Sequence, residues 1–266
     1  MRSLARLRPV ALALSLVVLA GCDIVTADFK SKETAEWRKT YQLQPGGRVE
    51  VANVNGKIDV TPSKDNTVEI VALKTARAST PEGAKAALER IEIREESGPA
   101  GIKVETRIAR GDGLFNRGGA EVSYTLRVPV SSDVRFTTVN GGIELSGLEG
   151  RVTAETTNGG IRARDLGGAI EASTTNGGVE VDLSRLAEPG VKLECTNGGI
   201  KLRLPSDVKA TISASITNGG IGVSDFEGDS LRTTETSRRR LEATLNGGGT
   251  SIRLAGTNGG IQIGKR

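Results

Sequence analysis

Two carboxylates, Glu180 and Asp182, have a spacing that could support paired-acid chemistry. They stand two residues apart in a run of alternating apolar and polar residues, so both side chains would leave the same face of a strand. Two carboxyl groups on one face can divide the acid and base roles that cleavage of a glycosidic bond requires. The pair therefore raises the hypothesis of a polysaccharide-active enzyme, either a lyase or a hydrolase.

The residues around the two acids favour a structural role instead. Neighbouring repeats carry bases at the equivalent positions, namely Arg162, Arg164, Lys201 and Arg203. Such bases keep carboxyl groups ionised, which disfavours the protonated form that a general acid needs. The chain also has no histidine, the commonest acid-base group and transition-metal ligand. We therefore expect no catalytic residue, no cofactor and no metal ion.

Cys22 carries the clearest chemical assignment. Three arginines precede an apolar stretch at residues 10–20, which is too short to span a bilayer because a membrane helix needs about 20 apolar residues. The stretch ends in Leu-Ala-Gly-Cys, which resembles the bacterial lipobox. That resemblance implies cleavage before Cys22, a thioether to diacylglycerol and acylation of the new amine, for instance by palmitate. Two or three acyl chains would anchor the protein stably. The alternative is an ordinary secretory signal followed by a chance cysteine.

Removal of this signal changes the charge of the chain. Three of the 36 basic side chains lie in residues 1–21 and none of the 32 acidic ones does, which leaves 33 basic against 32 acidic. A protein that binds nucleic acid usually carries a basic excess on one domain. The near-neutral charge of the mature chain removes the main support for that class, and we expect no nucleic-acid partner.

Two further motifs have a chemical and a structural interpretation. Cys195 is the only cysteine besides Cys22, so no intramolecular disulfide is expected. It occupies an inward position shared with Thr138 and Thr156, which indicates a small core residue and not a nucleophile. Arg238–Arg240 could bind an anionic surface such as a lipid headgroup layer. The alternative is a solvated loop.

A repeated phrase, strand then Asn-Gly-Gly then strand, organises residues 134–222. Its asparagines recur at intervals of 18, 18, 21 and 21 residues, and a period near 20 is typical of repeat architectures. The same pattern begins earlier, at VEVANVNGKIDV, and returns at the end in TNGGIQI. We assign a structural turn role to the asparagines Asn55, Asn140, Asn158, Asn176, Asn197, Asn218 and Asn258.

The repeats predict an all-β fold, a β-solenoid (β-helix-like) of stacked strand-NGG-strand rungs. Asn-Gly between strands is also a strong hairpin signal, so a meander of hairpins is the alternative. Small inward residues such as Ala154 and Ala172, with only 3% aromatic residues, favour a narrow solenoid interior. So does the series Glu144, Arg162, Glu180, Lys201, whose charges alternate as expected for neighbouring in-register strands. Around Asn246 the apolar pattern shifts by one residue, which indicates a bulge or a shifted rung.

The chain divides into a signal peptide (1–21), a lipidated tether (22–45) and a single β-repeat domain (46–266). The part at 46–133 is irregular and the part at 134–266 is regular. One short helix is inserted near 81–90, with Thr80 as N-cap and Pro81 at its first position. We expect the irregular strands and this helix to close one end of the stack, and the final Gly-Lys-Arg to discourage pairing at the other. The loop at 111–119 is glycine-rich, with a calcium-binding nonapeptide as the minor alternative.

The strand VSYTLRVP at 122–129, followed by successive NGxI repeats, resembles the DUF4097 family of adhesin-like, β-strand repeat-containing bacterial lipoproteins. Membership implies a β-helix-like extracytoplasmic protein without assigned catalytic residues. We expect a non-enzymatic scaffold or adhesin-like binding protein, anchored by its N-terminal lipid to a bacterial membrane. Its partner would be an envelope protein or a glycan. Asp23 directly after Cys22 resembles an inner-membrane retention signal, which favours the periplasmic face of the inner membrane over the outer membrane.

Overall fold

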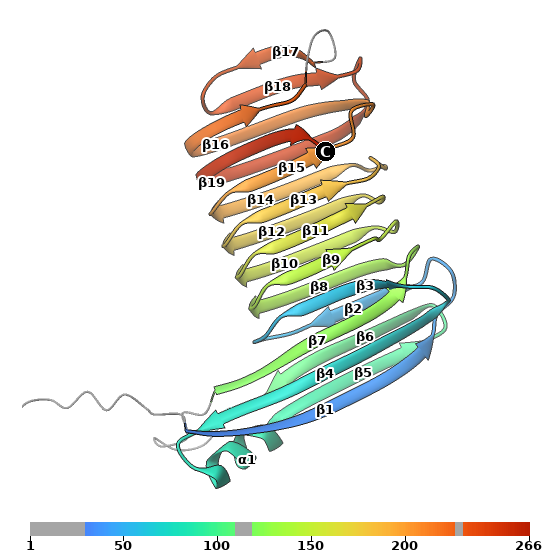
Figure 1. Ribbon diagram of the computed structural model, residues 1–266, viewed down its shortest axis with the longest axis vertical. Coiled ribbons are helices and arrows are strands. Elements are labelled where there is room, and N and C mark those ends of the chain that lie inside the picture. Colours follow the sequence, from blue (N-terminus) through green and yellow to red (C-terminus); the bar gives the residue numbers. More distant parts are fainter. Residues whose placement is uncertain (1–29, 110–118, 227–230) are drawn as a thin grey trace, which may run out of the picture.

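The computed structural model describes residues 30–109, 119–226 and 231–266 (Figure 1). Their strands form one continuous sheet that is folded into an elongated stack, with a single helix against its N-terminal end. The all-β class and the one helix are thereby confirmed. The signal peptide, Cys22, Asp23 and most of the loop at 111–119 lie outside the described residues.

The N-terminal end is built from long, mostly antiparallel strands. In the first group β4 (Thr67–Ala78) pairs antiparallel with both β1 (Ser31–Gln42) and β7 (Gly119–Pro129). In the second, β5 (Ile91–Gly98) pairs antiparallel with β6 (Gly101–Ile108). Strand β1 corrects the predicted tether at 22–45, because residues 31–42 pair with β4 along their whole length. Trp37 and Tyr41 of β1 pack against the core, which makes this segment part of the domain.

The predicted helix is confirmed as α1 (Pro81–Glu89). The side-chain oxygen of Thr80 accepts a hydrogen bond from the Gly83 amide at 3.1 Å and so caps the first turn. Ala84 and Ala87 are fully buried, and the helix lies against β1 and β4. Among the residues described, no helix is long and apolar enough to cross a membrane.

The repeats form two parallel ladders in which each strand pairs with the equivalent strand of the next repeat. The strands before the asparagines are β2 (Arg48–Ala52), β8 (Asp133–Asn140), β10 (Val152–Asn158), β12 (Ile170–Asn176) and β14 (Val191–Asn197). The strands after them are β3 (Ile58–Ser63), β9 (Ile143–Ser146), β11 (Ile161–Leu166), β13 (Val179–Leu183) and β15 (Ile200–Leu204). Strand β10 pairs with β8 and β12, and β11 with β9 and β13. The hairpin alternative, in which β10 would pair with β11, is therefore not what the chain adopts.

The last two repeats are continuous strands that belong to both ladders, and their spatial order is the reverse of their order in the chain. Strand β19 (Thr250–Lys265) lies between β14–β15 and β16 (Ala210–Val223), parallel to both. The intervening β17 (Leu231–Thr236) and β18 (Arg240–Leu245) form an antiparallel pair beyond β16. In Figure 1 the C-terminus accordingly lies beside β15, inside the stack. The expectation that the final Gly-Lys-Arg discourages pairing at the far end is wrong, because these residues lie beside β15 and the pair β17–β18 lies beyond β16.

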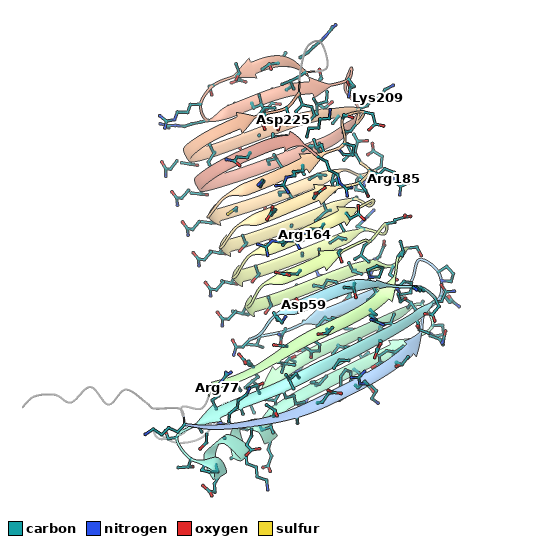
Figure 2. All side chains as sticks on the ribbon, viewed as in Figure 1. Asp59, Arg77, Arg164, Arg185, Lys209 and Asp225 are labelled. Atoms are coloured by element: carbon teal, nitrogen blue, oxygen red, sulfur yellow. The ribbon has the colours of Figure 1, made fainter. Side chains whose placement is uncertain are left out.

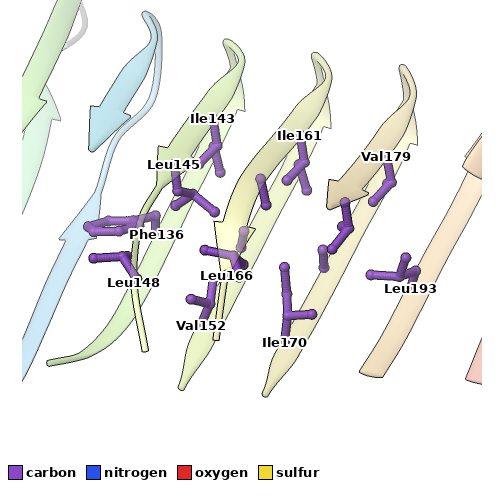
Figure 3. Packing of buried hydrophobic residues seen from close by; sticks show 14 of the residues in the cluster. Phe136, Ile143, Leu145, Leu148, Val152, Ile161, Leu166, Ile170, Val179 and Leu193 are labelled. Carbon is purple, nitrogen blue, oxygen red and sulfur yellow. The ribbon is translucent and has the colours of Figure 1, made fainter. Parts of the chain in front are cut away.

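The core consists of columns of similar apolar side chains from successive repeats. The residue three positions after each asparagine is almost fully buried at Ile143, Ile161, Val179, Ile200 and Ile261. Figure 3 shows such residues pointing from both ladders into the space between them, with Phe136 among them. Burying one such side chain contributes about 1.5–3 kcal/mol, so the columns hold the repeats in register. Near the N-terminal end, the Tyr124 hydroxyl lies 2.7 Å from that of Thr106, and burial raises its pKa to about 12.

Candidate binding surface

The predicted turn asparagines lie at the corner between the two ladders and form one hydrogen-bonded row. Six of the seven side-chain amides donate to the Oδ1 atom of a neighbouring asparagine at 2.7–3.0 Å. The row runs in the order Asn55, Asn140, Asn158, Asn176, Asn197, Asn258, Asn218. At its N-terminal end Asn55 donates to the Ala120 carbonyl at 3.0 Å. The row is exposed and unidirectional: every amide nitrogen donates toward the N-terminal end of the stack, and each Oδ1 except that of Asn218 accepts from the neighbour on its other side. At Asn218, the last member, Oδ1 has no side-chain donor among the described residues.

The first glycine of each corner is required by the stacking itself. A Cβ on Gly159 would lie 2.0 Å from the Gly141 carbonyl oxygen, and one on Gly177 would lie 2.1 Å from that of Gly159. Both glycines also have positive φ, whereas the asparagines beside them do not. The left-handed conformation that Asn can tolerate is therefore supplied by glycine, and the asparagine provides the side-chain hydrogen bond.

The second glycine of each corner faces a different constraint. A Cβ on Gly160, Gly178 or Gly199 would meet a backbone oxygen at 3.4 Å, an ordinary contact, and Lys57 occupies this position in the first repeat. Stacking therefore tolerates a side chain here. We call these residues the glycine row: Gly142, Gly160, Gly178, Gly199 and Gly260.

A hollow of about 660 Å³ runs along the glycine row. Its other wall consists of the outward residues of the ladder after the asparagines, which we call the charged face: Glu144, Arg162, Glu180, Lys201 and Gln262. The predicted neighbour relation is confirmed, since Glu144, Arg162, Glu180 and Lys201 pair in register on successive strands. The hollow is an open groove that crosses several repeats in the stacking direction.

Ion pairs join the charged face in a pattern that the simple alternation only partly predicts. Arg162 bonds Glu144 at 2.9 Å and Glu180 at 3.3 Å. Glu180 is then approached by Arg203 at 3.6 Å and not by Lys201, its neighbour in register. Lys201 has no ion-pair partner among the described residues. Each of these partly exposed pairs contributes at most about 1 kcal/mol to the stability of the fold. Their main effect is to fix the arrangement of charges on this face.

The candidate catalytic acids are both held by arginines. Glu180 contacts two of them, and Asp182 lies 3.2 Å from Arg266, which also bonds Asp165 at 2.7 Å. The contact of Arg266 with these acids could not be predicted from the sequence. It depends on the position of β19 beside β15, which brings the C-terminus near them. Figure 2 shows side chains along this face, with Asp59 and Arg164 labelled on it. Both acids therefore belong to ion-pair networks, which fits the structural role that the neighbouring bases indicate in the sequence.

Cys195 lies where the column of inward residues predicts. Its thiol is buried and donates to the Gly177 carbonyl at 3.1 Å, as the Thr156 and Thr174 hydroxyls do to Gly141 and Gly159. Burial raises the pKa of the thiol, which opposes formation of a nucleophilic thiolate. Within the described residues no group of histidine, cysteine and acidic side chains is arranged to hold a metal ion.

The Arg238–Arg240 triplet belongs to the C-terminal closure. The carbonyls of Arg238 and Arg239 accept hydrogen bonds from the amides of Ile221 and Ile216 on β16. Arg240 contacts Glu235 and Glu242, while the other two side chains are exposed. The backbone of the triplet is thus structural, and two of its three charges face solvent.

The stacked repeats, the asparagine row and the strand Val122–Pro129 define a β-strand repeat protein. The chain matches Toastrack DUF4097 over residues 32–264 and belongs to this family. The resemblance seen in the sequence is confirmed.

Three solved structures show a distant likeness. A "putative cell adhesion protein" from Clostridium sporogenes is 14% identical, with 88% of this chain and 100% of that chain covered and a TM-score of 0.48. A "putative adhesin" from Bacteroides fragilis is 10% identical, with 87% and 97% covered and a TM-score of 0.36. A "putative lipid binding protein" from Parabacteroides distasonis is 12% identical, with 90% and 98% covered and a TM-score of 0.27. No curated protein matches the chain. At these identities and TM-scores the similarities do not indicate what this chain binds.

Proposed function

We propose that this protein is a lipid-anchored, extracytoplasmic β-solenoid scaffold that binds a partner in the bacterial envelope without catalysis. The observation that carries the proposal is the repetition of one surface, since the same corner and the same outward positions recur from strand to strand in register. Extended repeat surfaces serve binding in other solenoid proteins. The partner would be an envelope protein or a glycan.

The anchor is proposed from the lipobox-like sequence that ends at Cys22. Acyl chains on this residue would hold the stack at a membrane through its N-terminal end, because β1 begins at Ser31. Asp23 favours the periplasmic face of the inner membrane. The C-terminal end of the stack would then point away from the attachment point.

The enzyme alternative has less support. Glu180 and Asp182 share a strand, but arginines contact both. The enzyme alternative would be supported if the wild-type chain depolymerised a glycan and Glu180→Gln, with its fold intact, did not.

The anchor is tested by growing cells with labelled palmitate and separating membranes from soluble proteins. The wild-type chain should carry label and sediment with the membrane, whereas Cys22→Ser should be unlabelled and soluble. Cys195→Ser serves as the matched control and should behave as the wild type. Equal sedimentation of wild type and Cys22→Ser, without label in either, would refute the lipid anchor.

The binding role is tested separately with photo-crosslinkers introduced at single sites in living cells. A crosslinker at Thr153 or Glu144 on the repeat surface should give a discrete adduct in the envelope. The same probe at Lys85 on α1 is the control. Adducts from no site on the repeats would contradict the scaffold proposal.

A further inference from the structure

The charged face ends, toward the C-terminal end of the stack, in a second hollow of about 420 Å³. It adjoins the groove along the glycine row, because Lys201 and Gln262 line both. The two hollows therefore form one continuous depression in the stacking direction. Figure 2 labels Asp225 in this region, near the C-terminal end.

The second hollow exists because glycines replace residues with long side chains in the last two repeats. Gly222 and Gly264 stand at outward positions that carry charged or amide side chains on earlier strands. A Cβ added at Gly222 would meet no atom within 4 Å, so packing does not require glycine there. The space is thus open above β19, a strand that pairs with β15 on one side and with β16 on the other.

The walls of this hollow carry an excess of positive charge. Lys201, Arg203 and Lys265 stand against a single acid, Asp225, which leaves a net charge of +2. Among the described residues neither lysine has an ion-pair partner, and Arg203 has only the 3.6 Å contact with Glu180. Balanced ion pairs in the middle of the charged face therefore give way to unpaired cations at its end.

The geometry points to this depression as the binding site of a linear acidic polysaccharide, a proposal that specifies the partner in the function proposed above. Carboxylates of uronic acid units would pair with Lys201 and Lys265, while hydroxyls would bond Gln262 and the Asp225 carboxylate. The glycine row would accept the flat apolar faces of the sugar rings. At the C-terminal end of the depression such a chain would meet Lys201, Gln262 and Gly222 on successive strands, which lie about 4.8 Å apart.

Other polyanions fit this depression less well. An extended peptide gains most of its affinity from backbone hydrogen bonds at a sheet edge. Most of the depression lies instead on the outer faces of β13, β15 and β19, which are paired with strands on both sides. A membrane surface requires cations that project together with apolar side chains, but these lysines line a hollow beside glycines. A polymer with many hydroxyl groups and regularly spaced carboxylates uses both features of the site.

The test measures binding of the purified full-length mature chain to polygalacturonate, with dextran, polyglutamate and anionic phospholipid vesicles as comparison probes. Lys201→Gln combined with Lys265→Gln should weaken binding about tenfold or more, because two charge-assisted contacts are lost. Gly222→Trp should weaken it similarly by filling the hollow without changing any charge. Lys64→Gln combined with Lys85→Gln removes the same charge elsewhere and should leave binding unchanged.

Each of the following results would overturn the proposal. They are no binding to polygalacturonate, equal loss in the Lys64/Lys85 control, and binding to polyglutamate or vesicles as tight as to polygalacturonate. Full binding by Gly222→Trp would also place the site elsewhere. None of these outcomes affects the palmitate labelling of Cys22, so failure here is distinguishable from failure of the lipid-anchor proposal.

Discussion

The middle of the stack and its C-terminal end are built from nearly the same phrase but are protected differently. In the middle, Ile161 is 1% exposed and Asn176 both donates and accepts a side-chain hydrogen bond. At the end, β18 covers only the first half of β16, and Ile221 is only half-buried. Asn218 donates a side-chain hydrogen bond there but accepts none from the residues that the structure describes. The same residues thus act as core in one place and as surface in the other. Position in the stack decides the role of each repeat residue as much as its type does.

The first way to test this comparison is substitution of the two glycines of one middle corner. Gly177→Ala places a Cβ 2.1 Å from the Gly159 carbonyl oxygen at a residue with φ of +146°, so it should cost more than about 3 kcal/mol or prevent folding. Gly178→Ala meets its nearest backbone oxygen at 3.4 Å and should change stability by less than about 1 kcal/mol. Urea unfolding of both variants measures the difference. Equal effects would show that the corners are not packed against one another.

The second test compares the isoleucine column in the middle and at the end. Ile161→Ala should destabilise the fold by about 2–5 kcal/mol because it leaves a cavity in the core. Ile221→Ala should cost roughly half as much or less, since solvent already reaches this side chain. Thermal and urea unfolding report both values. A larger loss at Ile221 would mean that something covers the end of β16.

The third test removes single members of the asparagine row. Asn176→Ala loses two side-chain hydrogen bonds and should cost about 1–2 kcal/mol, whereas Asn218→Ala loses one and should cost about 0.5–1 kcal/mol. Both side chains are exposed, so water replaces part of each bond. Indistinguishable losses in urea unfolding would argue against a cooperative row.

The smallest expected effect is that of Cys195→Thr, which gives this repeat the residue of its neighbours. The threonine hydroxyl can donate to Gly177 as the thiol does, so stability at neutral pH should change by less than about 1 kcal/mol. The pKa of the buried thiol is raised above its ordinary 9.0, so its contribution is complete below that value and is lost as pH rises through the folded pKa. Between these two pKa values the wild type should lose stability faster than Cys195→Thr. Parallel urea midpoints across this alkaline range would contradict the assignment.

Much of this fold could be predicted because matching residues in successive repeats indicate which residues lie side by side on neighbouring strands. The asparagines, the isoleucine column and the alternating charges at Glu144, Arg162 and Glu180 all require neighbouring strands in parallel. The position of β19 could not be predicted, since the units around Asn218 and Asn258 are nearly identical and either could follow Asn197. The second hollow depends on that position, because Gly264 becomes the neighbour of Arg203 only when β19 lies beside β15. Strand β1 was missed because its exposed, charged residues have the composition of a linker.

The order of strands at the C-terminal end is the central structural claim, because it decides which repeat is covered and where the unpaired cations lie. It can be tested with cysteine pairs in a chain lacking Cys22 and Cys195. Glu194 is paired in register with Ala255, which in turn is paired with Ser215. Adjacent strands are about 4.8 Å apart, and a disulfide tolerates Cα atoms up to about 7 Å apart, so next-but-one strands cannot be bridged. Rapid, complete disulfide formation in Glu194→Cys/Ala255→Cys, and none in Glu194→Cys/Ser215→Cys, is the predicted result. The reverse pattern would show that β16 lies beside β14 and would contradict the account.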